Sequence, residues 1–294
     1  MRILVTGASG RIGSFVATHL TEAGHEVVAT DVVYKSGLAV PVQVADLCDY
    51  TSIYPLVEGC DAVIQLGNHA GPHSVRPSQR MMNENVAMNA NVFYAALDVG
   101  VRRIVGISTI QVMLGRHASL GFWPPPQPCR LPYLPIDGQT PRNPGNNEYA
   151  LSKIFAEQTL EAMTAQHEDL AAIALRLPLV LTPQMREMRW RSEPLKRDDR
   201  RLNEALCYIM VEDVATALLA MVERANPGYR QYFLSQSLAV QGLSLDELAA
   251  QYFPDQEIRG VLSEDGGLVD LSELKEDFDW SPAKPRIEIE RDLG

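Results

Sequence analysis

A tyrosine and a lysine stand four residues apart in the stretch "NEYALSKIFAEQ", residues 147–158. The stretch has the spacing of an amphipathic helix, in which side chains at i and i+4 lie on one face. The phenol of Tyr149 and the ammonium of Lys153 can therefore lie close together. A free tyrosine has a pKa near 10, and a neighbouring ammonium favours the phenolate. The pair predicts either a proton-transfer site near neutral pH or a surface pair with no role, and the residues from Ile154 onward are interpreted as packing.

A glycine loop near the start of the chain predicts dinucleotide binding. In "VTGASGRIG" the spacing is Gly7-x-x-Gly10-x-x-Gly13, between a short apolar run and a helical segment. Glycines at such a turn let the backbone approach a pyrophosphate at the helix N-terminus. Asp31 ends the second apolar run, where its carboxylate either accepts hydrogen bonds from an adenosine ribose or caps a turn. Its charge favours NAD over NADP, although Lys35 nearby weakens that preference.

Short apolar runs alternate with segments of helical period, which predicts how these residues are positioned. The apolar runs are at 2–6, 26–31, 41–46, 61–67, 102–109 and 170–177, and helices are expected between them, including 83–100 and 148–166. Alternation of this kind predicts an α/β fold, a Rossmann-type doubly wound parallel sheet. We expect a dinucleotide-binding domain at 1–181 plus about 206–234, and a smaller substrate-binding region at about 182–205 and 235–294.

Two irregular segments interrupt this pattern. Residues 121–145 contain eight prolines, which favours a lid, and residues 186–201 carry seven basic and four acidic side chains. The basic segment is either part of an anion-binding site or a solvated loop. The tryptophans Trp123 and Trp190 either stack on a sugar or anchor their loops, and Arg76 and Arg80 are candidates to face the substrate.

Composition narrows the class of protein. The 294 residues carry a net charge of −11, which disfavours nucleic-acid and anionic-membrane binding. The four cysteines lack metal-ligand spacing, and Gly71 and Pro72 between His69 and His73 argue against a zinc site. No membrane span or signal-peptide core is evident, so a cytoplasmic protein is expected, with no metal.

Taken together, the motifs resemble the extended short-chain dehydrogenases/reductases, in particular the NAD-dependent epimerase/dehydratase group. The resemblance is carried by "TGASGRIG", "VIQLGN", "NENVAMNANVFYAALDVGVRRIVGIST" and "YALSK" and runs to about residue 180. It implies NAD as cofactor, and a homodimer formed through the helices at 83–100 and 148–166. It also implies Tyr149 as the acid/base, Lys153 as its partner, and Thr109, with Ser108 before it, as the hydroxyl that orients the substrate oxygen.

The resemblance further implies the residues that contact the cofactor. They are Gly7, Ser9, Gly10, Arg11 and Ile12 at the pyrophosphate, Asp31 at the ribose, Asp46 and Leu47 at the adenine, Leu66, Gly67 and Asn68 beneath the cofactor, Asn85 near the active site, and Tyr149 and Lys153 themselves. Two departures stand out: Ser108-Thr109 replaces a Ser-Ser pair, and "QLGNHA" replaces an alanine-rich "HLAA". The second changes the wall of the site near the nicotinamide.

These expectations define an enzyme acting on a carbohydrate-like small molecule. Hydride transfer at a secondary alcohol or ketone of a sugar, sugar acid or nucleotide sugar is the leading hypothesis, by an epimerase or a dehydrogenase; a dehydratase ranks lowest. The alternative is a non-catalytic dinucleotide sensor with the same fold. Such proteins typically lose the tyrosine or the lysine, and both are present here.

Overall fold

The computed structural model describes residues 1–71, 77–115, 131–189, 194–196 and 200–291. These residues divide into two compact units. The first comprises Met1–Ser108, Glu148–Leu175 and Val214–Gln231, and the second comprises Thr109–Asn147, Arg176–Asp213 and Tyr232–Gly294. The expected division into a cofactor-binding and a substrate-binding region is a functional assignment and stays a prediction.

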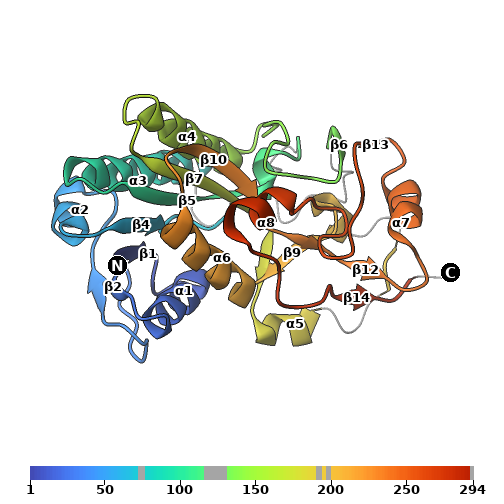
Figure 1. The fold of residues 1–294 in the computed structure, drawn as a ribbon, viewed down its shortest axis with the longest axis horizontal. Coiled ribbons are helices and arrows are strands. Elements are labelled where there is room, and N and C mark those ends of the chain that lie inside the picture. The colour runs from blue at the N-terminus through green and yellow to red at the C-terminus, as the bar shows by residue number, and fades with distance from the viewer. Residues whose placement is uncertain (72–76, 116–130, 190–193, 197–199, 292–294) are drawn as a thin grey trace. The chain divides into compact units, whose positions relative to one another are not determined.

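A seven-stranded sheet forms the centre of the first unit (Figure 1). Its order is β10 (Gly228–Phe233), β7 (Ala171–Leu177), β5 (Arg103–Thr109), β4 (Ala62–Gln65), β1 (Arg2–Thr6), β2 (Glu26–Asp31) and β3 (Val42–Val44). The pairs β1/β2, β1/β4, β2/β3 and β4/β5 are parallel. The chain starts at a central strand and reverses direction across the sheet, so the prediction of a doubly wound parallel sheet is confirmed.

The helices cover the sheet as the apolar spacing predicts. They are α1 (Arg11–Glu22), α2 (Tyr50–Val57), α3 (Ser78–Asp98), α4 (Glu148–Thr164) and α6 (Val211–Arg224). The helices α3 and α4 pack against each other, and with α2 they enclose a core that includes Phe93, Ile104 and Leu160. Helix α1 lies beside α6 in Figure 1. His25, which follows α1 in the chain, bonds Glu223 of α6 at 3.1 Å. Helix α3 begins five residues before the expected start at 83.

Short elements make up the second unit. They are β6 (Tyr133–Leu134) paired with β13 (Glu257–Ile258), β8 (Leu179–Leu181), β9 (Cys207–Met210) and β11 (Gln236–Ser237) in one sheet, β12 (Ala239–Val240) with β14 (Glu288–Ile289), and the helices α5 (Pro183–Arg189), α7 (Leu245–Tyr252) and α8 (Ser272–Phe278), with the 3-10 turns Ile110–Val112 and Arg200–Glu204. Helix α7 begins with a capping box between Ser244 and Glu247.

The buried guanidinium of Arg176 anchors a loop of this second unit. Arg176 is fully buried, and its Nη1 donates to the carbonyl oxygens of Gly138 at 3.2 Å and Thr140 at 2.8 Å. These contacts hold the described part of the proline-rich segment, whereas residues 121–130 of the predicted lid lie outside the described chain. Among the described residues, no helix is long and apolar enough to span a bilayer.

Candidate active site

The glycine loop between β1 and α1 is too tight for side chains. Gly7 has φ +65°, and a Cβ there would lie 2.9 Å from the nitrogen of Gly67. A Cβ on Gly13 would lie only 2.2 Å from the carbonyl oxygen of Gly7. Gly10 precedes α1 without a side-chain cap, so the first N–H groups of the helix, which have no helical acceptor, can serve a pyrophosphate. This part of the chain fits a dinucleotide.

The carboxylate of Asp31 is fixed at the end of β2. Its Oδ2 accepts the backbone N–H of Ser9 at 3.0 Å, and its Oδ1 accepts that of Val33 at 3.1 Å. The hydroxyl of Ser9 donates to the carbonyl oxygen of Val33 at 2.6 Å, which closes the loop around the carboxylate. Each carboxylate oxygen has further acceptor capacity, so Asp31 can still accept ribose hydroxyls. Arg11, at the start of α1, and Lys35, shortly after Asp31 in the chain, are both exposed.

A buried polar network joins the end of β4 to the glycine loop. The hydroxyl of Thr6 accepts the N–H groups of Leu66 at 3.0 Å and Gly67 at 2.9 Å and donates to Gln65. The amide of Gln65 donates to Gly67 at 2.9 Å and to Asn89 at 3.1 Å. The hydrogen bonds of Thr6 and Gln65 to Gly67 hold this residue against the glycine loop. Sequence reasoning missed Thr6, Gln65 and Asn89.

The residues expected at the adenine lie beside this network. The side chain of Leu47 is buried, and its Cδ1 lies 2.4 Å from the position that a Cβ on Gly67 would take. Asp46 is exposed and accepts the N–H of Cys48 at 2.9 Å. Leu47 therefore packs on Gly67, whereas the role of Asp46 toward a cofactor stays a prediction.

Tyr149 and Lys153 are both buried on α4. Tyr149 is 8% exposed and Lys153 3% exposed, and the Nζ of Lys153 lies 5.9 Å from the centre of the Tyr149 ring. The Nζ donates to Ile107 O at 2.8 Å and to the side-chain oxygen of Asn68. Burial lowers the pKa of Lys153 to about 7, and the negative charge of Glu157 opposes that change. The lysine is held between α4, β5 and the loop after β4, unlike a solvated surface lysine.

Ser108 and Thr109 end β5 but engage different partners. The hydroxyl of Ser108 donates to Oε1 of Glu157 at 2.6 Å, and Glu157 is 1% exposed on α4. Thr109 accepts the N–H of Gln111 at 3.3 Å, and its hydroxyl keeps its own proton to donate. Glu157 is a buried charge that sequence reasoning treated as part of a packing segment. Its spacing of four residues from Lys153 is the signal that could have revealed it.

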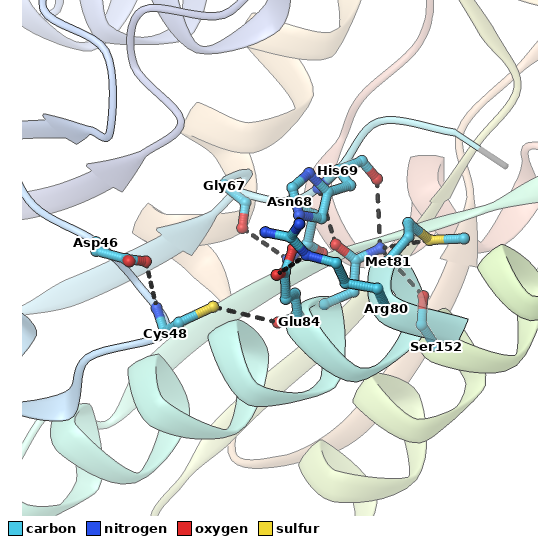
Figure 2. Close-up of polar contacts among 10 residues, drawn as sticks. Asp46, Cys48, Gly67, Asn68, His69, Arg80, Met81, Glu84 and Ser152 are labelled. Carbon is cyan, nitrogen blue, oxygen red and sulfur yellow. Dashed lines mark hydrogen bonds and ion pairs between the residues drawn. The ribbon is translucent and has the colours of Figure 1, made fainter. Parts of the chain in front are cut away.

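The start of α3 is tied to the loop after β4 by a second polar group (Figure 2). The Nε2 of His69 bonds Glu84 at 2.6 Å, and the Nε of Arg80 donates to Glu84 at 2.7 Å. These two neighbours hold the pKa of Glu84 below its ordinary value, with the hydrogen bond from Arg80 the larger cause. Glu84 therefore places the imidazole of His69 beside Asn68, and the charge of Arg80 is matched by that of Glu84.

Asn85, expected near the active site, bridges three elements. It is fully buried, and its Oδ1 accepts the N–H of His69 at 2.8 Å while its Nδ2 donates to the hydroxyl of Ser152 at 3.2 Å. The hydroxyl of Ser152 in turn donates to the carbonyl oxygen of Tyr149 at 2.7 Å. Asn85 thus connects the loop after β4 to the Tyr149–Ser152 segment of α4, and direct contact with a cofactor stays a prediction.

Several predicted residues fall outside the described chain. They are Arg76, His73, Trp123 and Trp190. Arg80 is described and exposed. Within the described ranges, no group of three or more His, Cys, Asp and Glu side chains could hold a metal ion.

The fold and the glycine loop define a nucleotide-binding protein with a lysine buried beside a tyrosine. A sequence model of the NAD dependent epimerase/dehydratase family matches residues 3–234. The chain therefore belongs to the NAD-dependent epimerase/dehydratase family, a family of enzymes whose cofactor is NAD. The resemblance stated from the motifs, and the cofactor it implies, are confirmed.

Individual relatives share part of the chain. Uronate dehydrogenase of Pseudomonas syringae pv. tomato is 30% identical over 159 residues, 53% of this chain and 51% of that protein. NAD-dependent glucose-6-phosphate dehydrogenase of Haloferax volcanii is 28% identical over 185 residues, 60% of this chain and 67% of that protein. The aligned region spans about half the length of the uronate dehydrogenase.

Solved structures share the fold across nearly the whole chain. UDP-glucose 4-epimerase of Bifidobacterium longum, in complex with NAD+ and UDP, matches with a TM-score of 0.67 and 19% identity, covering 97% of this chain and 94% of that one. A mutated uronate dehydrogenase matches with a TM-score of 0.59 and 23% identity, covering 96% of this chain and 87% of that one. At these identities the likeness concerns the fold.

Proposed function

We propose that the protein is an NAD-dependent dehydrogenase of a sugar or sugar acid, with Tyr149 as the acid/base at a secondary hydroxyl. The observation that carries the proposal is the burial of Lys153, 3% exposed, with its Nζ 5.9 Å from the Tyr149 ring. An ammonium in that position favours the phenolate and lowers the pKa of the phenol toward the working pH.

The proposed roles follow from the chemistry of each side chain. Tyr149 takes the proton of the substrate hydroxyl during oxidation and returns it to a carbonyl oxygen during reduction. Thr109 keeps a hydroxyl proton with which to orient the same oxygen. NAD, held by the glycine loop and Asp31, would supply the hydride acceptor for the carbon that carries this oxygen. Lys153, fixed by Asn68 and Ile107, supplies the positive charge that makes the tyrosine acidic.

Support for a free sugar acid or sugar phosphate as substrate comes from the relatives. Two are named uronate dehydrogenases and one is named an NAD-dependent glucose-6-phosphate dehydrogenase. The imidazole of His69, oriented by Glu84, stands next to Asn68 in the loop after β4 and can hydrogen-bond a polyhydroxylated substrate. An epimerase of nucleotide sugars is the second candidate, favoured by the likeness to UDP-glucose 4-epimerases.

A substrate panel with matched tyrosine variants tests this function. The chain is incubated with NAD and D-glucuronate, D-galacturonate, glucose 6-phosphate or UDP-glucose, and absorbance at 340 nm and epimer exchange are followed. We expect NADH to accumulate with a uronate or a sugar phosphate, and Tyr149→Phe to reduce turnover by at least about 100-fold. Tyr94→Phe, at an exposed position of α3, is the control and should keep full activity.

Three results would contradict the proposal. Turnover that survives Tyr149→Phe would remove the tyrosine from the reaction. Exchange of epimers without net NADH would replace the dehydrogenase by an epimerase. Binding of NAD with no turnover of any sugar in an extended panel would favour the non-catalytic sensor.

A further inference from the structure

Glu157 is a buried carboxylate with a defined partner. It is 1% exposed on α4, and the hydroxyl of Ser108 donates to its Oε1 at 2.6 Å. Burying a carboxylate is costly unless hydrogen bonds or an opposite charge compensate. A glutamine or a methionine would fill the same space without that cost, so the charge itself calls for an explanation.

The helix places this charge one turn from Lys153. Residues i and i+4 are neighbours on one helical face, so Tyr149, Lys153 and Glu157 follow one another along the same side of α4. Both the lysine and the glutamate are more than nine-tenths buried, where little water screens their interaction. The carboxylate and the ammonium are therefore coupled by their charges, with Ser108 holding the carboxylate from β5.

The other elements around Lys153 contribute neutral groups. The loop after β4 supplies the side-chain oxygen of Asn68, and β5 supplies the carbonyl oxygen of Ile107. From α3, the neutral Asn85 reaches the adjoining Ser152. Across the part of the chain that the structure describes, Glu157 is the one charged group that acts on the lysine, and it raises the pKa of Lys153 against the lowering by burial.

We propose that Glu157 is a positioning residue that keeps Lys153 protonated near neutral pH, and that Ser108 fixes the carboxylate for this purpose. The inference rests on the proposed function, because a protonated Lys153 matters only if Tyr149 exchanges a proton. Without the carboxylate, the lysine would lose its proton below neutral pH and would no longer favour the phenolate. Ser108 then acts through Glu157, and of the two hydroxyls only that of Thr109 orients the substrate oxygen.

The titration of Lys153 can be measured directly, without any substrate. The chain has five lysines, Lys35, Lys153, Lys196, Lys275 and Lys284, so the full-length protein labelled with 13C at lysine Cε gives a simple spectrum. The signal absent from Lys153→Met identifies Lys153. We expect Glu157→Gln, which keeps the shape of the side chain, to lower the titration midpoint of Lys153 by about one pH unit or more.

A matched variant separates this effect from a general change in charge. Glu161→Gln removes the same charge one turn further along α4, where the side chain is exposed, and should leave the midpoint in place. Glu157→Asp keeps the charge and should place the midpoint between those of the wild type and Glu157→Gln. An unchanged midpoint in Glu157→Gln, with the far-ultraviolet circular dichroism of the wild type, would overturn the inference.

A second variant tests the inference if Glu157→Gln fails to fold. If Glu157→Gln is unfolded, Ser108→Ala retains the carboxylate but releases its hydrogen bond, and the midpoint of Lys153 should fall in the same direction. A midpoint that stays at the wild-type value in Ser108→Ala would then contradict the inference. Failure of the proposed function has a different signature, because turnover would then survive Tyr149→Phe whatever the titration midpoint of Lys153 is.

Discussion

The burial of Lys153 predicts that the stability of the protein rises with pH above neutrality. Lysine has a pKa of about 10.4 in an unfolded chain, whereas burial lowers the pKa of Lys153 to about 7 in the folded protein. Between these values the unfolded chain binds the proton and the folded chain has lost it. The free energy of unfolding therefore increases as the pH rises through this window, and falls as the pH drops toward 7.

The size of the effect follows from the same two values. Each pH unit inside the window contributes up to about 1.36 kcal/mol, so the interval from about pH 7.5 to 9.5 corresponds to roughly 2 kcal/mol. The pKa of Lys153 in the folded protein already includes the effect of the Glu157 charge and of the contacts with Asn68 and Ile107. Methionine in place of the lysine cannot titrate, so Lys153→Met should lack this contribution at every pH.

Urea denaturation at a series of pH values, without NAD, measures the contribution. The quantity compared is the difference in unfolding free energy between wild type and Lys153→Met, which should grow by roughly 2 kcal/mol from about pH 7.5 to 9.5 in favour of the wild type. Lys35→Met, at an exposed position, should show the same pH dependence of the unfolding free energy as the wild type. Parallel curves for wild type and Lys153→Met would mean that the lysine titrates as in the unfolded chain, and the reasoning would be refuted.

Three other substitutions test the glycine loop, the carboxylate at the end of β2 and the loop that Arg176 anchors. Gly13→Ala places a Cβ 2.2 Å from the carbonyl oxygen of Gly7, so we expect NAD affinity by calorimetry to fall at least about tenfold and stability to drop by about 1–3 kcal/mol; wild-type affinity would contradict the tight loop. Asp31→Asn removes the charge that repels a 2′-phosphate, so the ratio of NAD to NADP affinity should fall several-fold in paired titrations, and an unchanged ratio would argue against Asp31 at the ribose. Arg176→Met leaves the carbonyl oxygens of Gly138 and Thr140 without this donor, and urea denaturation should show a loss of about 3 kcal/mol, whereas a loss under 1 kcal/mol would mean that water replaces the guanidinium.

The fold was predictable because its signals are local. Continuous apolar runs marked the buried parallel strands, and the glycine spacing marked the turn from β1 into α1. The element bounds differ by only a few residues, as in α3, which begins at Ser78 with Pro77 before it. Proline suits the residues around the start of a helix, so the helix extends further toward its N-terminus than the apolar spacing alone indicated.

The candidate site was predictable only in part, because buried polar networks depend on partners far apart in the sequence. The spacing of Tyr149 and Lys153 indicates this pair from the sequence alone. No local pattern indicates that Thr6 bonds Gln65, 59 positions away, or that Ser108 bonds Glu157, 49 positions away. Such pairings follow from strand order and helix packing. The sequence therefore indicated candidate catalytic residues, and the structure shows which side chains and backbone groups contact them.

The role of Ser108 shows how this distinction changes an interpretation. By position, Ser108 and Thr109 are equivalent hydroxyls at the carboxyl end of β5, and either could orient a substrate oxygen. Successive residues of a strand point to opposite faces, so only one of them can face α4. The structure places the hydroxyl of Ser108 2.6 Å from Oε1 of Glu157, and this contact favours Thr109 in the proposed role at the substrate. We therefore propose that Ser108 acts through Glu157 on Lys153, and that Thr109 orients the substrate oxygen, a role for which a threonine hydroxyl is sufficient.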